Sequence, residues 1–542
     1  MEIVDQRTKA IMEGCKERAR DAGLSFQDES LEYIVTNRDL LELMPKGMIP
    51  TLYDYWVHDV EVLREKGKYE LYPHNPYETV INTRPAISFF NDNNPDWLNV
   101  MIFYHVLAHI DFFQNNYYFR HTWDYDFTGR ALSDKRIISR LRAEKGRWAD
   151  YVLEFGRGID NLVGYHQKLS RLNRAPVRNG SRRLDYYFDV FLQSVKRVRT
   201  NDFVSEIERY NECKRQHGDR GEQRFFEEVE QQHPEFQTLF EKEKPREEPQ
   251  KQDLYEYLLD HSPFLSREEN KWMKMVLQVT RGTSMFFQPQ IRTKIMNEGW
   301  ASYWHETLFL QDDRIQGHEV EFARVNARVT AMPRVGLNPY ALGMRLFFFI
   351  EEFAGQGRYS RDYNRLRDVT ARDKFTRDGT DGRDFIYQIR ENLCDFTFVN
   401  SYVDQDFVNR YKLFVVGRRL NQDRMVWEYY IKSRKAEEYR QMLLESMYHP
   451  PHISVDPERG DNGALYLVHH FEEKPLVRDF IHNTMIGIEY LWGSKVQLET
   501  HEVKPRVSSA ASSAAENEAE PEVEWEKVLY SVENRKLTRK TL

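Results

Sequence analysis

Cysteine is scarce in this chain of 542 residues, which contains only Cys15, Cys213 and Cys394. The three lie far apart and form no C-x-x-C pair, so they supply neither a disulfide framework nor a thiolate zinc site. The charged N-terminal segment also lacks the apolar core of a signal peptide. Both absences are typical of a reducing compartment, and we predict a cytoplasmic protein.

Long apolar runs and an excess of positive charge are missing as well. No segment approaches the ~20 uninterrupted apolar residues of a membrane-spanning helix, which predicts a chain without a membrane span. Lys and Arg total 78 against 86 Asp and Glu, a formal net charge of −8. This balance gives no electrostatic reason to expect nucleic acid as a partner. Walker, G-x-G-x-x-G and G-x-S-x-G motifs are absent too.

Aromatic residues, in contrast, are abundant. The chain contains 31 Tyr and 33 Phe, and aromatic residues make up 14% of a composition that is 40% hydrophobic. A chain of this length and composition has enough apolar surface for two or three domains and at least one sizeable core. We therefore expect a globular protein whose cores and clefts are lined by aromatic side chains.

The hydrophobic pattern divides the first 395 residues into three parts. Apolar residues recur at helical spacing through most of residues 1–212 and 253–395, which predicts a mainly α N-terminal body in two parts. Residues 213–252 between them are charged, rich in Gln and Glu and poor in aliphatic residues. This composition predicts a surface linker or insertion with some helix.

The pattern changes after residue 395. Residues 396–503 alternate strand-like and helix-like segments in the order β-α-β-β-α-β, which predicts a small C-terminal α+β domain with a ferredoxin-like split β-α-β arrangement. Residues 504–542 begin with a Ser, Ala and Glu-rich stretch that cannot bury a core. We expect this last part to be a disordered tail.

The segment "HVLAHIDFFQNN" places His105 and His109 four residues apart in an apolar helical pattern. Residues at this spacing lie about 40° apart around a helix, so both imidazoles can bind one cation. The alternative is two core histidines bonded to backbone or tyrosine. Without some such partner, each buried polar group would cost ~1–3 kcal/mol. Asp111 lies two residues further on and does not share that face well, so it either supports the site or caps a neighbouring group.

A second segment, "KIMNEGWASYWHE", carries Glu298 and His305, which are about 20° from alignment after two helical turns. Its apolar neighbours predict burial, and a buried glutamate must be paired, protonated or metal-bound. The alternative is a salt bridge with Arg292 or a distant arginine. Together with His105 and His109, Glu298 would complete the His₂Glu set of a catalytic zinc site with an open position for water.

Residues 297–301 also look like the Asn-Glu-Gly-Phe-Ala segment that supplies the third ligand in gluzincin aminopeptidases. Those enzymes read H-E-x-x-H, with the glutamate as general base, whereas Val106 occupies that position here. Asp111 and His305 are the nearest candidates to handle protons instead. A two-iron carboxylate centre ranks last, because helical E-x-x-H pairs are too few.

Several long motifs in order resemble the stage V sporulation protein R (SpoVR) family: "YETVINTRPAISFF", "HVLAHIDFFQNN", "QIRTKIMNEGWASYWHE", "GLNPYALGMRLFFFIEE", "NGALYLVHHFEE" and "YLWGSKVQLET". The family pattern at the histidines, His-x-Tyr-Gly-His and then Asp-Phe-Phe-Lys-Asn-Asn, is matched at His105, His109, Asp111, Phe112, Phe113, Asn115 and Asn116. It is not matched at Leu107, Ala108 and Gln114. The resemblance implies a process, either spore cortex formation or a stress operon shared with a serine protein kinase and a von Willebrand-type partner, but it implies no reaction.

Two hypotheses of function follow from these residues. In the first, the chain is a metal-dependent hydrolase that holds zinc or another divalent cation at His105, His109 and Glu298, with Asp111 or His305 handling protons and a peptide or peptidoglycan-like amide as substrate. In the second, it is a non-catalytic adaptor that scaffolds a kinase-containing assembly, and the histidines serve only the core. The helices around residues 105–116 and 297–306 are expected to pack against each other.

Overall fold

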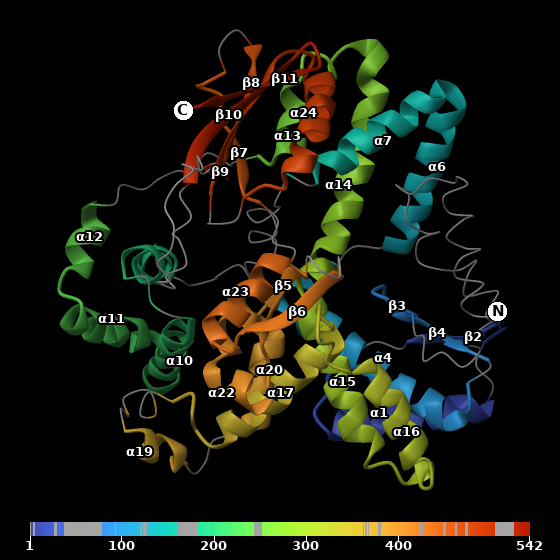
Figure 1. The fold of residues 1–542 in the computed structure, drawn as a ribbon, viewed down its shortest axis with the longest axis vertical. Coiled ribbons are helices and arrows are strands. Elements are labelled where there is room, and N and C mark those ends of the chain that lie inside the picture. The colour runs from blue at the N-terminus through green and yellow to red at the C-terminus, as the bar shows by residue number, and fades with distance from the viewer. Residues whose placement is uncertain are drawn as a thin grey trace.

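A computed structural model of the chain describes residues 2–3, 6–26, 30–36, 79–92, 94–119, 122, 127–160, 162, 182–196, 198, 200–242, 252–360, 363, 366, 368–377, 381–421, 426–447, 451–460, 463–471, 475–504 and 525–542. These residues are mostly helical, with strands gathered into three sheets. Two large apolar cores organise them, and Figure 1 shows a lower and an upper unit joined by the long helix α14 (Lys271–Arg292). No helix within these ranges has the length and apolarity needed to cross a membrane.

The lower unit is a helical assembly around the larger core. Its central helices are almost entirely apolar and therefore need neighbours on every side. They are covered by more amphipathic helices and short helical turns. The helices are α1 (Gln6–Asp21), α4 (Asp96–Asn115), α15 (Lys294–Phe309), α16 (Glu319–Val329), α17 (Pro339–Gly355), α19 (Val369–Asp373), α20 (Gly382–Asn392), α21 (Asp395–Tyr402), α22 (Gln405–Arg410) and α23 (Ala436–Ser446), with turns η2 (Tyr117–Phe119) and η6 (Asp313–Ile315).

A small sheet at the N-terminal side of this unit differs from the expected all-helical pattern. Its strands are β1 (Glu2–Ile3), β2 (Leu31–Val35), β3 (Thr79–Ile81) and β4 (Ile87–Asn91), in the order β1-β2-β4-β3. The central pair β2 and β4 is parallel and the outer pairs are antiparallel. Strands of two to five residues are too short to show a period of two, so the sequence pattern did not reveal them.

The upper unit packs helices against one face of a five-stranded sheet, in the order β11-β10-β9-β8-β7. Helix α24 connects the parallel pair β8 and β9, and the remaining pairs are antiparallel. The sheet shares its core with helices from the first half of the chain, so it does not stand apart as a C-terminal domain. The elements are α6 (Phe127–Lys145), α7 (Arg147–Ile159), α13 (Leu254–His261), η5 (Glu268–Asn270), α24 (Arg478–Trp492), β7 (Ile453–Val455), β8 (Leu465–His469), β9 (Val496–Val503), β10 (Trp525–Glu533) and β11 (Lys536–Thr541).

The C-terminal region is α+β, but its strands do not form the expected ferredoxin-like split arrangement. Strands β5 (Val415–Asn421) and β6 (Val426–Ser433) pair with each other as a separate hairpin instead of joining the larger sheet. Helix α23 behind them packs into the lower core. The first half of the expected motif therefore belongs to one unit and the second half to the other.

The expected disordered tail, residues 504–542, is also corrected in its last part. Residues 525–541 form β10 and β11, and β10 pairs with β9 along its length. Val528, Tyr530 and Val532 are buried on one face of β10, which is the period of two that a half-buried strand requires. Residues 505–524 lie outside the described residues.

The segment expected as a linker, residues 213–252, is mostly helical where the structure describes it. Residues 243–251 fall outside the described ranges. The rest packs with residues 182–196 around a small aromatic cluster that includes Tyr187, Phe191, Phe225 and Phe236. The elements are α9 (Arg182–Asp185), the π-helical η3 (Tyr186–Val195), α10 (Thr200–His217), η4 (Gly218–Arg220), α11 (Gly221–Gln232) and α12 (Phe236–Lys242).

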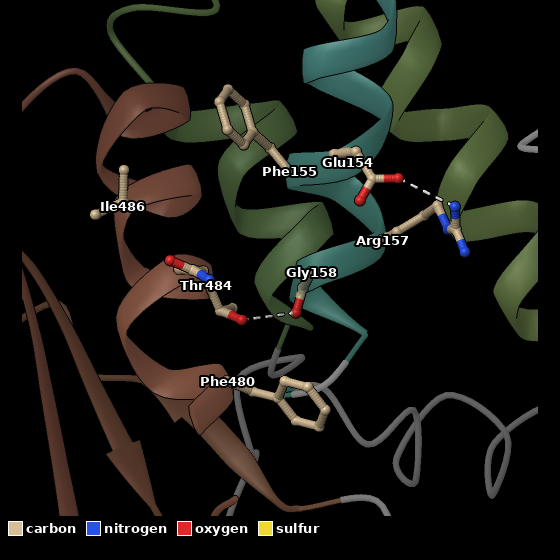
Figure 2. Close-up of a pocket in the computed structure, with 8 residues that line it drawn as sticks. Glu154, Phe155, Arg157, Gly158, Phe480, Thr484 and Ile486 are labelled. Carbon is tan, nitrogen blue, oxygen red and sulfur yellow. Dashed lines mark hydrogen bonds and ion pairs between the residues drawn. The ribbon is translucent and has the colours of Figure 1, made fainter. Parts of the chain in front are cut away.

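A hollow of about 490 Å³ lies between α7 and α24 in the upper unit (Figure 2). Glu154 and Arg157 on its rim form an ion pair of 3.1 Å. Thr484 donates a hydrogen bond of 3.3 Å to the carbonyl oxygen of Gly158. The charges of Glu154 and Arg157 at this hollow therefore balance each other.

Candidate metal site in the lower unit

Helix α4 supplies the two histidines and is buried on every side. Its residues from Leu98 to Phe113 are all buried, and the helix ends where the Asn116 N–H donates to the Phe112 carbonyl oxygen. His105 is 3% exposed and His109 is 4% exposed. Both imidazoles therefore need polar partners from the helices that pack on α4.

Helix α15 supplies those partners, and its first turn is fixed by a carboxylate from a distant segment. Asp395 accepts hydrogen bonds of 2.8 Å from the backbone N–H groups of Ile295 and Met296. Burial raises the pKa of Asp395 to about 7 in spite of these bonds. Helix α15 packs directly on α4 and also on α17, which confirms the expected packing of segments almost 200 residues apart.

The two histidines and Glu298 converge on one point. Glu298 Oε2 lies 3.8 Å from His105 Nε2 and 3.5 Å from His109 Nε2. One ligand atom from each residue lies within 4.8 Å of the others, and among the described residues this is the group found with metal-ligand spacing. The distances exceed those of good hydrogen bonds. Two ligand atoms held ~2.1 Å from a tetrahedral ion would lie ~3.4 Å apart, so the spacing fits a metal ion.

The protonation of His109 suits a ligand. Its Nδ1 lies 2.9 Å from Asn297 Oδ1. Because a carbonyl oxygen only accepts, Nδ1 carries the proton and Nε2 keeps its lone pair toward Glu298. Metal-binding histidines commonly donate their other N–H in this way. Asn297 precedes Glu298 in sequence, so one helical turn provides both a ligand and the residue that orients another.

His105 is oriented through a longer chain of contacts. Asn326 donates 2.7 Å to Glu306 Oε2 and presents its own oxygen 3.0 Å from His305 Nε2. His305 Nε2 therefore donates, and its Nδ1 accepts from His105 Nδ1 at 2.8 Å. The proton of His105 is then on Nδ1, and the lone pair of Nε2 faces Glu298. Burial and the neighbouring His105 lower the pKa of His305 to about 3, so His305 stays neutral.

Glu298 is ionised at this site. Burial opposes its charge, but its interactions with His105, His109 and Tyr340 together outweigh burial and lower its pKa. Its side chain is 19% exposed, so one side reaches the solvent-accessible space. An ionised carboxylate beside two neutral imidazole nitrogens is a donor set suited to a divalent cation. The alternative of a salt bridge between Glu298 and Arg292 is not what the structure shows.

Asp111 does not join the cluster. Its carboxylate accepts hydrogen bonds of 2.7 Å from the backbone of Ser25 and 2.8 Å from Trp300 Nε1, and it pairs with Arg390 at 3.3 Å. Burial raises its pKa against the opposing effect of Arg390. Asp111 thus ties α4 to α15 and α20, away from the histidines. The expected proton-handling role does not match this position, because at helical spacing Asp111 faces another side of α4.

The cluster opens into a cavity of about 500 Å³. Three of its polar residues, Lys294, Asn338 and Tyr340, were not among the candidates from the sequence. Helical spacing could have found Lys294, because it lies four residues before Glu298 on the same face. No local signal pointed to Tyr340, which arrives with the first turn of α17. The cavity is lined by Met101, His105, Lys294, Glu298, His305, Val329, Leu337, Asn338, Pro339 and Tyr340.

Comparison with known proteins shows which family has a sequence similar to this chain. The family model described as SpoVR like protein matches residues 4–450, which include the three clustered residues. The uncharacterized protein YcgB of Escherichia coli (strain K12) is 24% identical over 505 residues, which cover 86% of this chain and 86% of that protein. No solved structure gives a significant match.

Proposed function

This chain belongs to the SpoVR-like protein family, and we propose that it is a metal-dependent hydrolase whose divalent cation, zinc by preference, is held by His105, His109 and Glu298. The observation that supports this is the convergence of two imidazole Nε2 atoms on one carboxylate oxygen at 3.8 and 3.5 Å. Three protein ligands leave a fourth position open, as in catalytic zinc sites. The cavity of about 500 Å³ gives a substrate access to that position.

The absence of a glutamate next to His105, where Val106 stands, is compatible with this function. A catalytic zinc ion lowers the pKa of its bound water to ~7 and polarises a carbonyl group. With a metal bound, a water of that pKa would be partly ionised at neutral pH, and the chain would not need an adjacent carboxylate to remove its proton. Within the described lining of the cavity, Glu298 is the one carboxylate, and it serves as a ligand. His305 then acts by positioning His105, and Asp111 by holding the helices together.

Hydrolysis of a peptide or peptidoglycan-like amide is the reaction to test. Zinc-loaded protein incubated with a peptide mixture, or with muropeptides, should produce new amine termini detectable by mass spectrometry. Chelator-treated protein and the Glu298→Gln variant should lose this activity by at least ~100-fold, because a ligand is missing. Glu321→Gln, an exposed residue on α16, is the matched control. Equal product from the apo and zinc-loaded protein would contradict the proposal.

Asn326 should control metal affinity without contacting the metal. In Asn326→Leu the acceptor of the His305 proton is lost, His105 can protonate on Nε2, and metal binding should weaken ~10–100-fold. Competition with a chromogenic chelator measures this. The exchanged pair Asn326→Asp with Glu306→Gln keeps an acceptor facing His305 and should restore affinity. Asn392→Leu, on the exposed end of α20, is the control. Unchanged affinity in Asn326→Leu would exclude the positioning role.

A specific observation also favours the adaptor hypothesis. Tyr429 and Ile431 on strand β6 are 62% and 47% exposed, and because they lie two residues apart they form an apolar surface on one face of a two-stranded sheet. Such a surface suits a protein partner, and a serine protein kinase or von Willebrand-type protein is the partner that the family resemblance suggests. The two functions respond differently to chelation: an enzyme loses turnover, whereas an adaptor keeps its partners in a pull-down from cells.

A further inference from the structure

Lys294 is a charged residue of the cavity that the metal site does not use. It is the first residue of α15, lies one helical turn before Glu298 and lines the same cavity of about 500 Å³. It is exposed, whereas the histidines beside it are buried. Among the described residues that line the cavity, Lys294 is therefore the cationic side chain that a substrate would meet.

The other polar residues of the cavity are already engaged. His305 has hydrogen-bond partners on both nitrogens. Asn338 Oδ1 accepts from the N–H groups of Tyr340 and Ala341, and its Nδ2 donates to the carbonyl oxygens of Val329 and Ala331. Tyr340 bonds Glu298. Of the described polar groups that line the cavity, Lys294 remains for a bound molecule.

Lys294 is also not neutralised by a neighbouring carboxylate. Glu298 is four residues away on the same helix, yet its Oε2 faces the two histidines. A lysine that precedes a glutamate by four residues is in the less favourable order for a helical ion pair. No ion pair joins Lys294 to a carboxylate of the part of the chain that the structure describes. The ammonium group is thus available to an anion.

The charges of the loaded site add up to a positive cavity. The divalent cation contributes +2, Glu298 −1 and Lys294 +1, while the three histidines are neutral, which leaves +2 in a chain whose formal net charge is −8. Charge of one sign concentrated in a cleft attracts ligands of the other sign. The apolar part of the lining consists of Met101, Val329, Leu337 and Pro339.

We propose, on the basis of the proposed function, that Lys294 binds an anionic group of the substrate, either a carboxylate or a phosphate. A short chain would separate this anion from the group of the substrate that reaches the metal. The apolar part of the lining receives the chain between the two groups. A hydrogen bond to a charged group contributes ~1.5–3 kcal/mol, so the anion should tighten binding by about tenfold or more.

Two hydroxamic acids that differ in one group test this on the zinc-loaded full-length protein. Butyrohydroxamic acid ends in a methyl group, and succinic acid monohydroxamate carries a carboxylate in its place, while both bind zinc through the hydroxamate. Calorimetry should show the charged probe binding about tenfold or more tightly. A phosphonate-ended analogue distinguishes the two anions: tighter binding than the carboxylate identifies a phosphate-bearing substrate, and weaker binding a carboxylate-bearing one.

The variants separate the anion site from the metal site. Lys294→Met should bind butyrohydroxamic acid and zinc as before but lose the preference for the charged probe, and Lys294→Arg should keep most of it. Arg157→Met, at the other hollow (Figure 2), is the control and should keep the full preference. Equal affinity of the wild-type protein for both probes overturns the role of Lys294 and leaves the metal site standing. Failure to bind zinc, or to bind either probe when zinc is present, overturns both proposals.

Discussion

Replacing His105 and His109 together with alanine should reduce the zinc content of purified protein from about one ion per chain to none. Two of the three proposed ligands are lost, and one carboxylate does not hold zinc against competing buffer and water. Apparent affinity should fall by at least ~10³-fold, which is about 4 of the ~10–16 kcal/mol that zinc binding contributes in complete protein sites. Metal analysis by mass spectrometry, followed by zinc titration against a chelator, measures both quantities.

The control for this experiment is a second pair of histidines. His452 and His470 in the upper unit stack with ring centroids 4.4 Å apart, but they do not belong to the group with metal-ligand spacing. Their double alanine variant should keep full zinc content. Replacing His105 and His109 with alanine leaves a cavity around a buried helix, which destabilises the fold. Circular dichroism is therefore needed to check that both double variants are folded. Equal and negligible zinc in the wild type and the His105 and His109 variant would end the metal-site proposal and favour the adaptor.

Gly343→Ala should destabilise the lower unit by about 3 kcal/mol or more. Helices α15 and α17 cross where Gly299 faces Gly343, and their backbones touch there. A Cβ atom on residue 343 would lie 2.1 Å from the carbonyl oxygen of Ile295 and 2.7 Å from the Cα of Gly299. Neither contact can be relieved by moving a side chain, because both involve backbone. The helices must therefore separate, and urea unfolding should show the loss.

The same substitution should weaken zinc binding, because Glu298 is the residue before Gly299. Gly355→Ala, on the same helix, is the matched control, since its Cβ would meet its nearest neighbour, the backbone nitrogen of Gly382, at 3.9 Å. This variant should keep its stability to within ~0.5 kcal/mol and bind zinc normally. If the two alanine variants unfolded at the same urea concentration, the close crossing of the helices would not be the feature that holds Glu298 in place.

The ligand residues themselves could be predicted from sequence because helical spacing is a local property. Four residues separate His105 from His109, which places both on one face of any helix that includes them. The apolar neighbours on all sides predicted that the helix is buried, and a buried helix with two imidazoles needs polar partners. Glu298 was found by the same argument in α15. The packing of α4 on α15 then followed from the need of both helices for burial, and it is confirmed.

Local spacing did not determine where the remaining residues point or which strands meet. Asp111 looked like a candidate for proton transfer until the structure showed its contacts with Ser25, Trp300 and Arg390. The strands at 415–433 had the pattern of a split β-α-β motif, yet among the strands that the structure describes they pair only with each other. Strand pairing over long separations depends on which cores compete for an element, and a single sequence does not encode that choice in any local pattern.

What the sequence determined by itself was the set of donors, His105, His109 and Glu298, because type and spacing are enough to place donor atoms on helix faces. What only the tertiary structure decided was their state and surroundings. The tautomer of His105 depends on Asn326 through His305, and the cavity exists because α17 crosses α15 closely enough to bring Tyr340 beside Glu298. Both depend on contacts between helices that are distant in sequence, where hydrogen-bond direction and backbone distance are fixed by packing rather than by local periodicity.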